Sequence, residues 1–81
     1  MINNSTSWHR AQKDRLKRIL SKISEWPEPM MRLVAARLNV LVDAVDHLNG
    51  RPRSGSNHEY VARNIGELED AVDQMGVKVS V

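Results

Sequence analysis

Large apolar residues recur at alternating steps of four and three through the middle and last thirds of this 81-residue chain. Such steps place side chains along one stripe of an α-helix, the spacing of a coiled-coil seam. The first third has a looser stripe, in which Gln12 fills one gap. The pattern predicts an all-α antiparallel three-helix bundle with coiled-coil-like packing, and it is compatible with a helical homodimer. The three stripes are Trp8, Leu16, Ile19, Ile23 and Trp26; Val34, Leu38, Leu41, Val45 and Leu48; and Val61, Ile65, Leu68, Val72 and Met75.

Proline and glycine set the expected limits of these helices. The residue before a proline is pushed out of the α region, so Pro27 should end the first helix, whereas Pro29 suits the first turn of the second. Gly50 and Gly76 should end the second and third helices. We expect one domain over residues 7–76, with helices at about 7–25, 29–49 and 57–75.

Other local signals concern the ends of the chain and the third helix. We expect flexible tails at residues 1–6 and 77–81, although the alternating valines of the last stretch also suit an edge strand that pairs with another chain. Ser56 and Glu59 fit a capping box. Gly66 lies inside the third helix and indicates either close approach by another backbone or simple tolerance of glycine.

The second helix is more apolar than a helix of a small bundle needs to be. Three apolar residues widen its seam on each side: Met31, Ala35 and Val42 on one, and Leu33, Val40 and Ala44 on the other. Because each outer helix brings only one seam, we expect the strip through Met31, Ala35 and Val42 to stay open. Self-association would cover it, since two-fold dimers are the commonest soluble oligomers.

Arg37 falls within this apolar arc and has two interpretations. Its stem packs while its guanidinium reaches water, or it pairs with an acidic residue of a partner. The residues predicted to contact a partner or a second copy are Met31, Arg32, Ala35, Arg37 and Val42.

The net charge of +2 is unevenly distributed, with a basic first helix and an acidic third. In an up-down-up bundle these helices run parallel, so we expect basic residues of the first to meet Glu69, Asp70 and Asp73. The same cations would also attract the phosphates of a nucleic acid. The predicted basic face consists of Arg10, Lys13, Lys17, Arg18 and Lys22.

No motif in the sequence indicates an enzyme, a cofactor or a metal. Cysteine is absent, which removes disulfides and thiolate ligands. Asp43, Asp46 and His47 have helical ligand spacing, but no second cluster completes a coordination shell. A helix-turn-helix is disfavoured because the connection before the third helix is long and that helix is acidic.

These observations favour a small, non-enzymatic, cytoplasmic protein that binds a larger protein as a regulator or inhibitor, of the kind that mobile elements encode. We expect neither a secretory signal nor a membrane span, because the first residues lack the basic-then-apolar order of a signal and no apolar run has the length of a span. One alternative is a nucleic-acid-binding accessory that uses the basic first helix. Another is a structural assembly or adaptor subunit.

Overall fold

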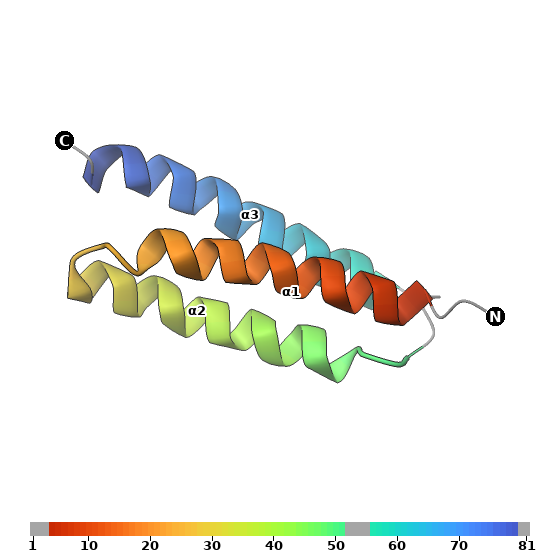
Figure 1. The fold of residues 1–81 in the computed structure, drawn as a ribbon. Helices are drawn as coiled ribbons and strands as arrows, with labels where there is room; N and C mark the ends of the chain where they lie inside the picture. The colour runs from red at the N-terminus through yellow and green to blue at the C-terminus, as the bar shows by residue number, and fades with distance from the viewer. Residues whose placement is uncertain (1–3, 52–55, 80–81) are drawn as a thin grey trace.

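The computed structural model describes residues 4–51 and 56–79, with the side chains of residues 7–51 and 57–76. It contains three helices, α1 (Asn4–Ile23), α2 (Glu28–His47) and α3 (Ser56–Val79). The helices α1 and α3 run parallel, and α2 runs antiparallel to both (Figure 1). The result is a rod of 49 × 17 × 16 Å. The all-α three-helix bundle predicted from the apolar spacing is therefore confirmed.

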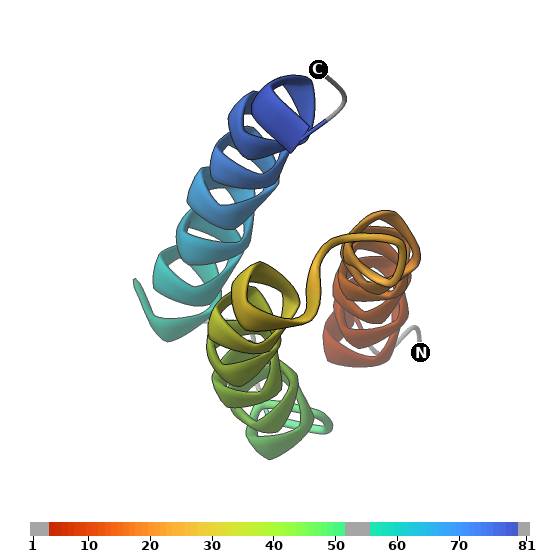
Figure 2. The same cartoon turned by 90° about the vertical axis from the view of Figure 1, so that its left-hand side faces the viewer.

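The three helices do not pack equally. The most extensive packing is between α1 and α2, and the least extensive is between α2 and α3. Seen along the rod, α3 is inclined to the other two helices (Figure 2). The boundary between α2 and α3 is therefore the least extensively packed of the three.

The hydrophobic core is built from the three predicted stripes. Ile23, Val45 and Ile65 have no exposed surface. Burial of each large apolar side chain contributes about 1.5–3 kcal/mol to stability, so the stripes supply most of the force that holds the helices together. The core comprises Trp8, Leu16, Ile19, Ile23, Val34, Leu38, Leu41, Val45, Leu48, Val61, Ile65, Leu68 and Val72.

The turn between α1 and α2 follows from its prolines. Pro27 has φ −53° and ψ 139° and lies directly before α2, and Pro29 lies in the first turn. The amide of Trp26 donates to the carbonyl of Ile23 over 3.0 Å and closes the end of α1. At the other end of α2, Gly50 has a φ of +82°, the left-handed conformation expected there.

Four of the six helix ends lie within two residues of the expected positions, and the other two differ by three and four residues. The helix α1 begins at Asn4, inside the segment predicted to be a tail, because a run of polar residues gives no periodicity by which to locate a start. The helix α3 continues through Gly76 to Val79, since a glycine in helical conformation costs only about 1 kcal/mol and does not by itself end a helix. The rest of both predicted tails, residues 52–55 of the connection between α2 and α3, and the side chain of Ser56 in the capping box lie outside the described residues.

Gly66 does not mark a close approach of backbones. A Cβ atom at this position would meet only Nη2 of Arg15, at an ordinary contact distance of 3.5 Å. Simple tolerance of glycine is therefore the interpretation that the structure supports.

Two polar side chains are buried with the core. Gln12 accepts a hydrogen bond of 2.8 Å from Nη1 of Arg15. The ring of His58 packs edge-on against that of Trp8, with centroids 4.6 Å apart. Within the described part of the chain, Nε2 of His58 has no hydrogen-bond partner, and the ring contributes to the core by packing against Trp8.

Candidate interaction surface

A furrow runs between α2 and α3. It consists of three hollows that share residues from one to the next: Arg37 lines the first two, and Val40, Ala44, Tyr60 and Val61 line the last two. Its described lining comes from α2, from Leu48 directly after α2, and from α3. We call this feature the furrow and define it by Leu33, Val34, Arg37, Val40, Leu41, Asp43, Ala44, His47, Leu48, Asn57, Tyr60, Val61, Asn64, Glu67, Leu68, Ala71 and Met75.

Large apolar side chains stand exposed along the furrow. The exposed fractions are 75% for Leu33, 67% for Val40 and 65% for Tyr60. From Leu33 to His47 the α2 wall is about 21 Å long, or about four helical turns. Leu20, 50% exposed, is a large apolar residue of α1 that does not line the furrow.

The α2 wall of the furrow is a second helical seam. Leu33, Arg37, Val40 and Ala44 follow one another at steps of four, three and four residues, so they share one flank of the helix. This flank lies beside the buried seam that contains Val34. On this flank Leu33, Arg37 and Val40 are exposed, whereas Ala44 is half-buried and packs against the core.

The strip that was expected to stay open is instead partly covered. Met31, Ala35 and Val42 are half-buried and pack against the core. They share their flank of α2 with Asp46, which contacts α1, so the extensive α1–α2 packing covers them. The exposed apolar surface of α2 is on the opposite flank, with Leu33 and Val40.

The two arginines among the predicted contact residues have different surroundings. Arg32 is exposed and pairs with Glu28 one turn earlier, with 2.6 Å between Nη2 and Oε1. Arg37 is exposed at the furrow and forms no ion pair with any described residue. Of the residues predicted to contact a partner, Arg37 is the one that lines the furrow.

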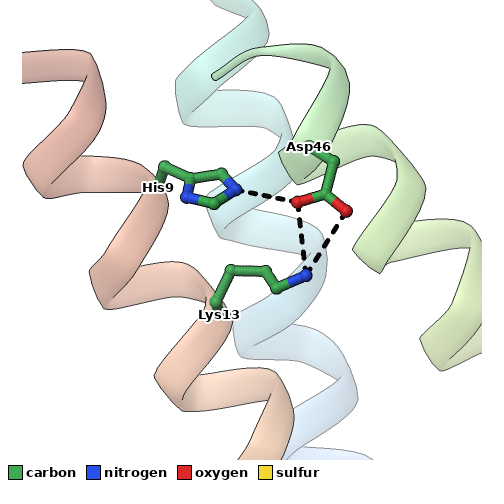
Figure 3. Close-up of polar contacts among 3 residues, drawn as sticks. All are labelled: His9, Lys13 and Asp46. Atoms are coloured by element: carbon green, nitrogen blue, oxygen red, sulfur yellow. Dashed lines mark hydrogen bonds and ion pairs between the residues drawn. The ribbon is translucent and has the colours of Figure 1, made fainter. Parts of the chain in front are cut away.

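One carboxylate joins α1 to α2 (Figure 3). The Oδ1 atom of Asp46 lies 2.8 Å from Nε2 of His9 and 3.2 Å from Nζ of Lys13. The hydrogen bond from His9, followed by that from Lys13, lowers the pKa of Asp46 below its ordinary value of 3.8. The side chain of Asp46 is about half exposed, so the cluster orients two helices without forming a closed site.

Two further ion pairs join α1 to α3, as the opposite charges of these helices predicted. Arg15 donates from Nε and Nη2 to both carboxylate oxygens of Glu69, and this pairing raises the pKa of Arg15. Lys22 pairs with Asp73 at 2.8 Å. Asp70, which was expected to join them, is exposed and has no ion pair with a described residue.

The basic face of α1 is consequently divided. Lys13 and Lys22 are committed to carboxylates of neighbouring helices. Arg10, Lys17 and Arg18 are exposed and form no ion pair within the described ranges 4–51 and 56–79. Three cations on the outer side of α1 thus remain available to solvent or to an anion.

The acidic cluster considered for a metal is split between two sides of α2. Asp46 binds to α1, whereas Asp43 and His47 line the end of the furrow. No group of three or more metal-ligating side chains occurs among the described residues. Nor does any helix in the described part of the chain combine the length and the hydropathy of a membrane span.

Sequence reasoning identified Leu33 and Val40 as apolar excess but assigned the open side to the other flank. The periodicity shows how wide the apolar arc of α2 is, but not which side of it each neighbouring helix covers. Composition alone counts Tyr60 with the two tryptophans as core material, but Tyr60 is exposed on α3, outside the buried stripe of that helix. Comparison with protein-family models, curated proteins and solved structures found no match to this chain.

Proposed function

We propose that this protein works by binding rather than by chemistry, as a small regulator or inhibitor of a larger protein. The observation that carries the proposal is the furrow, where Leu33, Val40 and Tyr60 are exposed together. Proteins rarely group large apolar side chains on the surface unless another molecule covers them.

The proposed partner presents an amphipathic helix. The furrow has helical walls and a length of about four turns, so a helix lying in it would complete a four-helix arrangement. Apolar side chains of that helix would contact Leu33 and Val40. An acidic side chain would meet Arg37, which has no ion-pair partner among the described residues.

Site-specific photo-crosslinking in the source organism tests this proposal. We expect a photoreactive residue at Val40 to capture one larger protein, whose crosslinked peptide is an amphipathic helix. The purified chain should bind that helix, and Leu33→Glu should weaken the binding at least tenfold, because it removes apolar contact and places a carboxylate one turn from Arg37, where it competes with the acidic side chain of the bound helix.

Leu20 is the matched control, because it is exposed and apolar but lies outside the furrow. A photoreactive residue there should not capture the same protein, and Leu20→Glu should leave the binding of the purified helix unchanged. Equal capture from both positions, or no capture from Val40, would contradict the proposal.

Nucleic-acid binding is the second candidate, supported by the exposed Arg10, Lys17 and Arg18. It predicts binding to duplex or single-stranded probes that weakens steeply with salt and with Lys17→Glu. A structural assembly subunit, the third candidate, predicts oligomers larger than a dimer in light scattering. Leu33→Glu should not affect nucleic-acid binding, so these outcomes are distinguishable.

A further inference from the structure

The furrow flank of α2, exposed at Leu33, Arg37 and Val40 and half-buried at Ala44, has the spacing needed for pairing with a copy of itself. Leu33, Arg37, Val40 and Ala44 repeat at steps of four, three and four, the arrangement by which two helices interdigitate side chains. Leu33 and Ala44 are a large and a small residue near opposite ends of this seam. In an antiparallel pair of α2 helices, each would meet the other across the contact.

The charges of the furrow are also self-complementary. Arg37 on α2 and Glu67 on α3 line the same hollow from its two walls, and neither forms an ion pair with a described residue. A two-fold interface brings the same patch of both copies together, so every contact occurs twice. A two-fold axis near the middle of α2 would direct Arg37 of each copy toward the wall that carries Glu67 in the other.

We propose that, when no other partner is bound, the furrow is occupied by a second copy of this chain, with the two α2 helices antiparallel and Arg37 of each copy paired with Glu67 of the other. This inference rests on the proposed function, because it uses the same furrow. The two occupants exclude each other, so the homodimer is the resting form and must dissociate before a larger protein binds.

Sedimentation velocity over a range of concentrations tests the homodimer. We expect a mass of twice 9.2 kDa at high concentration, with a dissociation constant on the order of 10 µM. Val40→Glu should weaken the dimer at least tenfold, and the control Leu20→Glu should leave it unchanged. Circular dichroism should show that both variants keep the helical content of the parent chain.

Charge reversal tests the ion pair across the two copies. Arg37→Glu and Glu67→Arg should each weaken the dimer, because each places like charges together. The double variant should recover it to within about threefold of the parent chain. A chain that stays monomeric at several hundred micromolar, a dimer that Val40→Glu leaves intact, or a double variant that fails to recover would overturn the inference.

These outcomes are separate from those of the proposed function. A monomer whose Val40 position still captures a larger protein would overturn only the homodimer. A dimer whose Val40 position captures nothing but its own second copy would support the homodimer and contradict the larger partner.

Discussion

At the scale of single residues, the polar contacts of this bundle connect helices rather than assemble a reactive centre. The pairing of Arg15 with Glu69 and of Lys22 with Asp73 follows from the opposite charges of α1 and α3, and the sequence predicted it. The role of Asp46 could not be predicted in the same way. Its partners on α1 are 37 and 33 residues away in the chain, and only the rotation of α2 about its axis brings them together.

The first prediction concerns the titration of Asp46. In the parent chain its carboxyl should titrate below 3.8, because His9 and Lys13 stabilise the ionised form. His9→Gln with Lys13→Gln should raise this pKa toward its ordinary value. The measurement is a titration of the side-chain carboxyl by nuclear magnetic resonance.

The sign of the linked effect on stability follows from this shift. A carboxyl with a lowered pKa in the folded state stabilises that state above the pKa of the unfolded chain, about 3.9. The contribution is lost as the pH falls through the lower folded-state pKa. Asp43→Asn is the control, because Asp43 lies on the same helix without an ion pair to a described residue; if it shifted the titration of Asp46 as much as the double change, the assigned cause would be wrong.

At the scale of the elements, the three helices were predictable because each has a long, strongly periodic stripe. The turn through Pro27 and Pro29 was also predictable, since proline restricts the backbone in the same way in every context. The helix ends that no proline marks were not predictable. Gly76 is compatible both with a helix end and with a helix interior, and local sequence alone does not separate the two.

The second prediction compares two glycines. Gly66→Ala should stabilise the bundle by about 0.5–1 kcal/mol, because alanine favours the helix and its Cβ meets only the end of the Arg15 side chain. Gly50→Ala should destabilise it by about 1–2 kcal/mol, because the φ of +82° is strained for a residue with a Cβ. Urea unfolding measures both changes, and effects of the same sign would contradict the argument.

At the scale of the whole molecule, the composition of each face depends on how the helices are arranged around one another. The sequence predicted that the bundle buries one stripe from each helix and that α2 has apolar surface to spare. The sequence did not predict which flank of α2 stays exposed, because the flank that holds Met31 and the flank that holds Leu33 are both apolar. The helix α1 packs more extensively on α2 than α3 does, and this difference decides which flank of α2 stays exposed.

The third prediction tests this assignment with two valines of α2. Val45 is fully buried and Val40 is 67% exposed. In protein kept dilute enough to be monomeric, Val45→Ala should cost about 2 kcal/mol through lost burial and the resulting cavity. Val40→Ala should change stability by less than about 0.5 kcal/mol. Thermal unfolding, monitored by circular dichroism, measures the stability of both variants. Equal losses of stability would mean that the exposed flank of α2 has been assigned wrongly.

The edge-on packing of Trp8 against His58 has a practical consequence. The chain holds one other indole, Trp26, which lies beyond the opposite end of α1 and close to Gly76 of α3. Intrinsic fluorescence of the parent chain therefore mixes two reporters with unlike surroundings. Replacing either indole by phenylalanine would leave a single tryptophan, which excitation at the red edge of the absorption band selects over Tyr60. Fraying of the helices at one end of the rod can then be measured separately from unfolding at the other end.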